Sequence, residues 1–384
     1  MIPLSIPNFE GNELKYVTDA VGQGWVSTGG AYITQMEEKM AEYVKAPKAV
    51  ACQSGTAALH LSLMECGVER DDLVIVPTVT FIAAVNPVVY SGAEPVFMDC
   101  DDSLCMDPVK LEAFCKEECE MKDSELFHKA TGKRVSAIVV VHVFGNMADM
   151  ESIMDTAARY NLKVVEDATE ALGTRYTSGK YEGKFAGTIG DFGAYSYNGN
   201  KIITTGGGGM VVAKDQKQLE HIAYKSTQCK DDPLFYVHNE VGYNYRMTNV
   251  QAAIGVAQLE CLEEFVERKN KNYDLYKSLF EGSDAVELLE FREGTYSNRW
   301  FYSLEVKKPG VDMHQLVHDL SDRGIQTRLI WALIHEQKPF KDSITYKIEK
   351  ADRYSKCILN IPCSTNLSED DIRTVAETVL DVLK

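Results

Sequence analysis

Short apolar runs alternate with longer amphipathic stretches in the N-terminal part of the chain. The runs lie at 49–52, 73–77, 95–99, 137–143 and 162–167, and their Val, Ile and Ala content is typical of buried strands. Several of the stretches between them have the periodicity of helices. Strands that are joined by helices pair in parallel, with helices over both faces of the sheet. The pattern therefore predicts an α/β fold with a mainly parallel sheet.

The pattern changes at Thr248, where it becomes strongly helical. One face of this helix carries an apolar stripe of Val256, Leu259, Leu262 and Val266. We expect the helix to connect a large domain with an N-terminal arm, residues 1–255, to a smaller α+β domain. The connector and the smaller domain together make up residues 256–384.

Composition and charge exclude several kinds of partner. The chain has 384 residues and a formal net charge of −17 at pH 7, which argues against nucleic acid or an anionic membrane as a partner. No apolar run is long enough to span a bilayer, and residues 1–5 lack the basic and hydrophobic regions of a leader. The ten cysteines have no metal-type spacing. We therefore expect reduced thiols, a cytoplasmic protein and no metal site.

Lys201 stands out among the lysines because of its neighbours. It lies between a predicted strand that ends at Ser196 and four consecutive glycines at 206–209. Glycines let the backbone come close to a ligand or adopt positive φ. A lysine held in a pocket of this kind can lose its proton and attack a carbonyl, as a Schiff base requires. The alternative is an exposed lysine on a strand–turn–strand with a flexible tip, and this segment alone does not decide between the two.

A second candidate site follows the predicted strand at 49–52. Ser54, Gly55 and Thr56 form a tight turn, and Ser54 or Thr56 can cap the helix that comes next. The free amides at the start of a helix bind anions, so this turn is a candidate phosphate site. An ordinary capped helix after a strand is an equally common interpretation when the motif stands alone.

These segments gain weight from their common position. In a parallel sheet, ligands bind outside the carboxyl ends of the strands. The strand boundaries place 54–56, Phe81, His142, Asp167 and Lys201 at such ends. A lysine, a carboxylate, an anion cradle and an aromatic side chain are the parts that a pyridoxal phosphate site needs, because a carboxylate beside the pyridine nitrogen keeps it protonated.

With these motifs, the sequence resembles the DegT/StrS-type sugar aminotransferases over nearly the whole chain. The matching segments are 54–61, 77–81, 166–171, 190–196, 200–201 and 242–252. The resemblance implies the type I (aspartate aminotransferase) fold, with a mainly parallel seven-stranded sheet, helices on both faces and a smaller C-terminal α+β domain. Lys201 itself excludes the related sugar 3-dehydratases, which have His at that position.

The resemblance also implies which residues bind the cofactor, pyridoxal 5'-phosphate. They are Ser54, Gly55, Thr56, Phe81, Asp167, Glu170, Ser196, Asn198, Lys201 and Asn244. Lys201 and Asp167 are the implied catalytic residues: Lys201 carries the cofactor as a Schiff base and moves protons, and Asp167 pairs with the pyridine nitrogen. Phe81 is expected to stack on the ring. Glu170 stands where many relatives have Gln or His beside the ring hydroxyl, so its role there depends on whether it is protonated.

Other implied roles concern the partner subunit and the substrate. Asn244 is expected to reach the phosphate of a neighbouring subunit, which implies a homodimer with shared active sites; its alternative role is to cap a loop. Arg246, Arg328 and His335 are the candidate substrate-binding residues, and Arg246 could equally be structural.

The expected reaction is the transfer of an amino group from glutamate to a nucleotide-linked sugar. The segment around Lys201 resembles enzymes that aminate the 4-keto position of UDP-linked 4-keto-6-deoxy sugars for bacterial surface glycans. The alternatives are a GDP- or dTDP-linked sugar as acceptor, an amino-acid aminotransferase, which differs in its acceptor, and a non-catalytic regulatory protein that binds pyridoxal phosphate.

Overall fold

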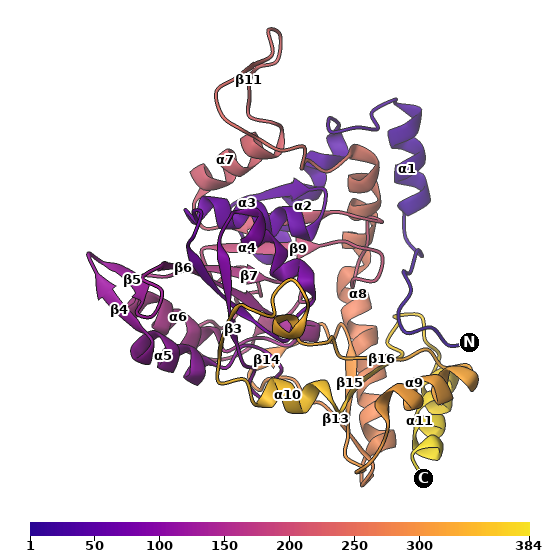
Figure 1. Cartoon of the computed structure of the whole chain (residues 1–384). Helices are drawn as coiled ribbons and strands as arrows, with labels where there is room; N and C mark the ends of the chain where they lie inside the picture. Colours follow the sequence, from indigo (N-terminus) through magenta and orange to yellow (C-terminus); the bar gives the residue numbers. More distant parts are fainter.

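The computed structural model describes all residues from 1 to 384, and a ten-stranded sheet forms its centre (Figure 1). Eight strands follow the order β1-β10-β9-β7-β6-β2-β3-β17, and the hairpin β4–β5 pairs with β6. The strands are β1 Ala49–Cys52, β2 Leu73–Pro77, β3 Glu94–Met98, β4 Cys119–Lys122, β5 Glu125–His128, β6 Arg134–Val141, β7 Lys163–Asp167, β9 Phe192–Ser196, β10 Gly209–Ala213 and β17 Ile344–Tyr346.

The predicted mainly parallel sheet is confirmed. Along the eight-strand order, β10 alone runs opposite to the others, because it is antiparallel to both of its neighbours. The seven strands from β1 to β3 correspond to the expected number. The additional strands are β17, which comes from the C-terminal part, and the hairpin β4–β5.

Helices cover both faces of this sheet, so the strands are buried on both sides (Figure 1). Ile75, Val139 and Val165 in β2, β6 and β7 are completely buried. The helices of this part are α1 Glu13–Gly22, α2 Ala31–Val44, α3 Gly55–Glu65, α4 Asn86–Tyr90, α5 Pro108–Glu117, α6 Met150–Arg159 and α7 Gln216–Ser226. Their packing explains why the strands are continuous apolar runs and not alternating ones.

Polar caps fix where the helices begin. Ser54 caps α3 through a hydrogen bond from the amide of Ala57, and Asp107 and Asp149 cap α5 and α6 in the same way. Thr248 opens α8, Asn249–Phe280, with a capping box that Gln251 completes. The predicted change to a helical pattern at Thr248 is therefore confirmed.

Helix α8 leads from the central sheet to a smaller antiparallel sheet (Figure 1). This second sheet has the order β13-β15-β18-β16. The strands of this sheet are β13 Val286–Leu288, β15 Tyr302–Val306, β16 Arg328–Leu329 and β18 Ile358–Ile361. The helices of this part of the chain are α9 Met313–Asp322, α10 Lys350–Ser355 and α11 Glu369–Val382. The expected boundary at residue 255 falls within α8, and the division into two domains at that point stays a prediction.

Residues 4–6 of the N-terminal arm hydrogen-bond to the segment that follows β18 of the smaller sheet. The amide of Cys363 donates to the carbonyl of Leu4 (2.8 Å), and the amide of Ile6 donates to Ser364 Oγ (3.0 Å). The remaining strand pairs are β8 Arg175–Tyr176 with β14 Thr295–Tyr296, and β11 Lys230–Asp232 with β12 Val237–His238. The β11–β12 hairpin projects from the top of the molecule in Figure 1.

No helix of the chain combines the length and the apolar character that crossing a membrane requires.

Candidate active site

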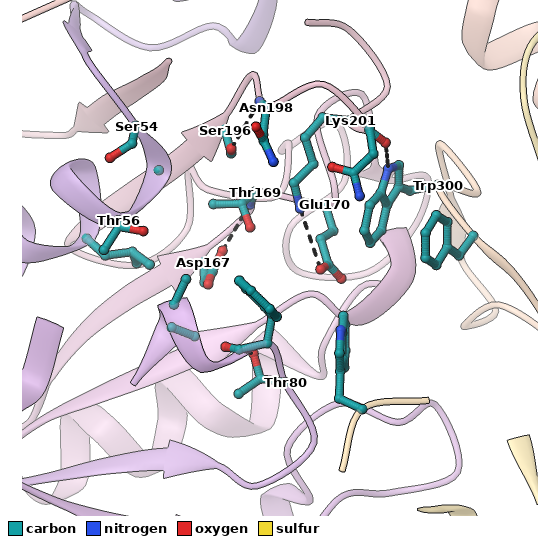
Figure 2. A pocket seen from close by; sticks show the side chains of 18 of the residues that line it. Ser54, Thr56, Thr80, Asp167, Thr169, Glu170, Ser196, Asn198, Lys201 and Trp300 are labelled. Carbon is teal, nitrogen blue, oxygen red and sulfur yellow. Dashed lines mark hydrogen bonds and ion pairs between the residues drawn. The ribbon is translucent and has the colours of Figure 1, made fainter. Parts of the chain in front are cut away.

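A cavity of about 470 Å³ opens where the carboxyl ends of β7 and β9 meet the N-terminus of α3. Its opposite wall comes from the C-terminal part of the chain, through Trp300, Phe301, Arg328, Trp331 and Asn360. Figure 2 shows Lys201, Asp167 and Glu170 around this space, with Ser54 and Thr56 at one end and Trp300 at the other. The cavity therefore lies between the two sheets, at the edge of the parallel sheet where ligands are expected.

Lys201 lies in the loop between β9 and β10, and its side chain is only 12% exposed. Its Nζ lies 3.6 Å from Glu170 Oε1 and 4.1 Å from the centre of the Trp300 ring (Figure 2). Trp300 in turn donates from Nε1 to the carbonyl of Asn200 (2.7 Å). The amine is thus held between a carboxyl group and an aromatic face, and the loop that carries it is bonded to that aromatic side chain.

Asp167 ends β7 and is 4% exposed. Oδ1 accepts a hydrogen bond from the amide of Thr169 (3.1 Å), and the side chain of Thr169 also interacts with the carboxylate. Burial raises the pKa of Asp167, because Lys201 and the Thr169 hydrogen bond compensate only partly for the loss of water. A cation against the carboxylate would restore the ionised form. A protonated pyridine nitrogen fits this requirement.

The neighbouring Glu166 points to the other side of β7 and stabilises the structure around the site. It accepts hydrogen bonds from the amides of Gly187, Ile189 and Gly190 and from His142 Nε2. His142 is completely buried in this network and does not line the cavity. Its strand end lies where the sequence places it, but its side chain bonds to Glu166 and to the amide of Ala148 and not to the cavity.

The start of α3 offers an anion cradle. Ser54 Oγ accepts from the amide of Ala57, and Ala58 makes the first intrahelical bond, so the amides of Gly55 and Thr56 have no partner in the chain. Ser196 lines the same end of the cavity. A Cβ at position 55 would lie 2.9 Å from Ser196 Cβ, so glycine is what allows α3 to approach β9 here. A phosphate fits this group of donors.

Phe81 and Asn198 complete the part of the site that belongs to the central sheet. Phe81 lines the cavity and is 55% exposed, which is unusual for a phenylalanine and leaves its ring available to a planar ligand. Asn198 also lines the cavity, and its amide donates to Ser196 Oγ (3.3 Å).

Glu170 is the second buried carboxyl group that lines the cavity. It is 5% exposed, and Oε2 accepts from the amide of Phe144 (2.8 Å). Burial raises the pKa of Glu170 to about 7, against the lowering influence of Lys201 and the Phe144 amide. Near neutral pH this group can therefore either accept a hydrogen bond or donate one.

Three of the expected site residues do not line the cavity. Asn244 is exposed on the segment after the β11–β12 hairpin. Arg246 forms an ion pair with Glu37 (2.5 Å) and donates to the carbonyl of Ala51. His335 shares a hydrogen bond with Thr78 (2.7 Å). Of the substrate-binding candidates, the structure places only Arg328 in the cavity.

The aromatic wall, which we define as Trp300, Phe301 and Trp331, was not predicted from the sequence. Trp300 and Phe301 stack with ring centres 4.0 Å apart, and Trp331 lies 4.7 Å from the ring of Phe144. The only available signal was composition, because Trp300 and Trp331 are two of the three tryptophans in the chain. Thr169 and Asn360 also line the cavity without any local motif that marks them.

A buried lysine and a buried carboxylate, beside an anion cradle at the edge of a parallel sheet, define a pyridoxal-phosphate-dependent enzyme of fold type I. The chain belongs to the DegT/DnrJ/EryC1/StrS aminotransferase family, whose sequence model matches residues 7–380. The match confirms the family, the enzyme class and the cofactor that the sequence motifs indicate.

Individual relatives cover almost the whole chain. GDP-perosamine synthase of Escherichia coli O157:H7 is 35% identical over 378 residues, which are 98% of this chain and 97% of that protein. UDP-4-amino-4,6-dideoxy-N-acetyl-beta-L-altrosamine transaminase of Campylobacter jejuni is 27% identical over 393 residues, covering 100% and 98%. The crystal structure of a DegT DnrJ EryC1 StrS aminotransferase from Brucella abortus matches with a TM-score of 0.87 at 25% identity, covering 97% and 95%.

Proposed function

We propose that this enzyme transfers an amino group from glutamate to the 4-keto carbon of a nucleotide-linked 4-keto-6-deoxy sugar, for the synthesis of bacterial surface glycans. The observation that carries the proposal is the position of Lys201 Nζ in a cavity that also contains Asp167 and the free amides of α3. This arrangement supports transamination and not binding alone, because a protein that only bound the cofactor would not need a mobile amine beside the reacting carbon.

The cofactor would be held from three directions. The amides of Gly55 and Thr56 with Ser196 Oγ would bind its phosphate, and Phe81 would cover its ring. Asp167 would hold the proton on the ring nitrogen. When bound, pyridoxal phosphate supplies an electron-accepting ring that stabilises negative charge at the α-carbon of the amino donor.

Lys201 then moves the proton. As a general base, its Nζ would take the proton from the α-carbon of the amino donor. As a general acid, it would then deliver that proton to the cofactor carbon that carries the transferred amino group. The contacts of Nζ with Glu170 and the Trp300 face hold the amine in the cavity, and the stacked Trp300 and Phe301 form an aromatic wall beside it.

The identity of the nucleotide on the acceptor sugar is a more specific part of the proposal. The segment around Lys201 points to a UDP-linked sugar, and the Campylobacter relative carries UDP in its name. The relative at 35% identity is a GDP-perosamine synthase, which puts a GDP-linked sugar beside it as a candidate. The two names share a nucleotide-linked sugar, and this shared chemistry is what we propose for the acceptor.

We also propose a homodimer in which Asn244 completes the partner's phosphate site. Asn244 is exposed and lies outside the cavity of its own chain, which is what a residue acting across an interface requires. The β11–β12 hairpin close by presents three large apolar side chains, Leu234, Phe235 and Tyr236, each at least 73% exposed. Apolar surface of this kind supports a buried position in an assembly.

The test is a glutamate-driven amination screen of UDP-, GDP- and dTDP-linked 4-keto-6-deoxy sugars, with product mass as the readout. The proposal predicts a mass change for at least one sugar and none with Lys201→Ala. A regulatory protein would bind pyridoxal phosphate but leave its absorbance unchanged on addition of glutamate. That result would contradict the proposed function.

A further inference from the structure

Asn298 lies in the turn that leads into the aromatic wall. It is completely buried, and it does not line the cavity. Its Nδ2 donates to the carbonyls of Glu170 and Leu172 (2.9 Å each), and its Oδ1 accepts from the amide of Trp300 (3.0 Å). Both N–H groups of the side chain are therefore used within the chain, and one residue joins the backbone at Glu170 to the backbone at Trp300.

Glu170 and Trp300 are the two residues between which the Lys201 amine is held. Nζ lies 3.6 Å from Glu170 Oε1 and 4.1 Å from the centre of the Trp300 ring (Figure 2). Glu170 follows β7 of the central sheet, and Trp300 precedes β15 of the smaller sheet. Asn298 thus connects, from outside the cavity, the two parts of the chain that meet around the amine.

The turn that contains Asn298 is strained. Arg299, which separates Asn298 from Trp300, has a φ of 46°, in the left-handed region that an arginine rarely adopts. Its Cζ lies 3.9 Å from the centre of the Tyr273 ring, and its guanidinium pairs with Asp274 (2.6 Å). Backbone strain persists only where the surrounding structure enforces it, and it is concentrated at functional sites. The fold therefore enforces a defined backbone position directly before Trp300.

Gly145 provides the space that Asn298 occupies. A Cβ at position 145 would overlap Asn298 Oδ1 and would lie 3.0 Å from the amide nitrogen of Trp300. The carbonyl of Gly145 accepts from Thr174 Oγ1 (2.9 Å) and from Ser297 Oγ (2.7 Å), which hold the turn from a second side. The bridge is thus part of a buried and satisfied hydrogen-bond network, and such networks fix the geometry of the groups that they connect.

We propose that Asn298 is a positioning residue for Lys201. By joining Glu170 to Trp300, it sets the spacing between the carboxyl group and the aromatic face, and thereby the place of the amine between them. A displacement of about 1 Å at a reacting group can cost about 10²-fold in rate. The inference rests on the proposed function, in which the Lys201 amine attacks the cofactor and then moves the proton.

The first experiment measures the Lys201 amine in the apoprotein, before any turnover. Pyridoxal phosphate is added, the reaction is stopped with borohydride at successive times, and the mass of the peptide that contains Lys201 is followed. In this step Nζ forms a bond to the aldehyde carbon, and the aldehyde oxygen leaves as water. Asn298→Ala is expected to lower the attachment rate at saturating pyridoxal phosphate about 10- to 100-fold.

Asn249→Ala is the matched control. Asn249 is 2% exposed, its Nδ2 donates to the carbonyl of Trp25 (2.7 Å), and its Oδ1 accepts from the amide of Tyr32 (3.0 Å). None of these three residues lines the cavity. Both alanine variants should be less stable than wild type in urea unfolding, because each leaves buried backbone groups unpaired. Only Asn298→Ala should also change the attachment rate.

Asn298→Ser separates the local turn from the bridge. A serine hydroxyl can accept from the amide two residues further on, as the asparagine does, so this variant keeps the turn. It lacks the N–H groups that reach the carbonyls of Glu170 and Leu172. Its attachment rate should therefore lie within about threefold of that of Asn298→Ala. A wild-type rate in Asn298→Ser would overturn the proposal, because the bridge would then not be needed.

The second experiment compares the same variants in the glutamate half-reaction of the holoenzyme, which is followed through the absorbance of the bound cofactor. Asn298→Ala should lower the rate at saturating glutamate about 10- to 100-fold. The glutamate concentration at half-maximal rate should change less than about threefold, because the variant misplaces the reacting amine and leaves substrate binding intact. Asn249→Ala should match wild type in both quantities.

The outcomes distinguish this role from the proposed function. Wild-type rates in both Asn298 variants, or a loss in Asn249→Ala as large as that in Asn298→Ala, would overturn the positioning role while leaving the proposed function intact. If glutamate does not alter the absorbance of the wild-type holoenzyme, the proposed function itself fails, and with it the role of Asn298 in proton transfer.

Discussion

The cavity contains few charged side chains, but burial gives the charge of each one a large free-energy cost. Asp167 and Glu170 both lack full compensation in the chain alone, and burial raises the pKa of each. Perturbed carboxyl groups of this kind cluster at functional sites, where a ligand supplies the missing partner. We propose that the ring nitrogen of the cofactor is the missing partner of Asp167, whereas protonation removes the buried charge of Glu170.

Asp167→Asn tests the first of these statements. The substitution keeps the shape but removes the charge that would hold the ring nitrogen protonated, so we expect turnover to fall about 10²- to 10⁴-fold. The apoprotein should be no less stable than wild type, because an uncompensated buried carboxylate has been removed. Steady-state kinetics and urea unfolding of the apoprotein measure the two effects. Near wild-type turnover would remove Asp167 from the mechanism.

Glu170 predicts a pH dependence with a definite sign. Its pKa is about 7 in the folded chain against an ordinary 4.5, so between these values the folded state binds more protons than the unfolded state. Stability therefore falls as pH rises through this window. Glu170→Gln removes that loss. The free energy of unfolding of the variant minus that of wild type should therefore be larger at about pH 8 than at about pH 4, by up to about 3 kcal/mol. Urea unfolding of both apoproteins at the two pH values measures this, and a difference that does not change with pH would contradict it.

At the scale of elements, the site depends on how closely α3 approaches β9. Gly55 allows this contact, because a Cβ there would lie 2.9 Å from Ser196 Cβ in β9. The same Cβ would lie 2.9 Å from Thr169 Cγ2. Gly55→Ala is therefore expected to displace the start of α3 and weaken pyridoxal phosphate binding at least about tenfold, the equivalent of one lost hydrogen bond to a charged group. Equilibrium dialysis of the cofactor measures the effect.

Gly22→Ala is the matched control for this substitution. Gly22 ends α1, and a Cβ there would meet nothing within 4 Å. Its cofactor affinity should equal that of wild type. If Gly55→Ala binds the cofactor equally well, the close contact is not what forms the phosphate cradle.

The elements differ in how far the sequence predicts them. Strands such as β2 and β7 are predictable because burial on both faces selects a continuous apolar run. β17 is not, since its three residues, Ile344–Tyr346, become a strand only by pairing with β3. The same reason separates Arg328 from Arg246: both are isolated arginines in the sequence, and only the fold puts one in the cavity and the other against Glu37.

The candidate site divides along the same line. Its central-sheet half could be predicted because turns and strand ends carry local motifs. Trp300, Trp331 and Asn360 could not, because they reach the cavity only through the placement of the smaller sheet, which packs on α8.

At the scale of the whole molecule, the cavity of one chain contains Lys201 but not Asn244. If two chains share each site, mixing two inactive variants restores function. Lys201→Ala lacks the amine and Asn244→Asp repels the partner's phosphate, so a mixed dimer would contain one intact site. We expect the refolded mixture to recover about a quarter of wild-type activity, since about half of the dimers are mixed and each has one competent site. Either variant refolded alone is the control, and no recovery in the mixture would contradict the shared site.

The central claim is that the amine of Lys201 binds pyridoxal phosphate covalently, and one measurement tests it directly. The holoenzyme is reduced with borohydride and digested, and the masses of the peptides are determined by mass spectrometry. The account predicts a pyridoxyl group on the peptide that contains Lys201, and its absence from the Lys201→Ala variant. A pyridoxyl group on a different lysine, or on none, would contradict it.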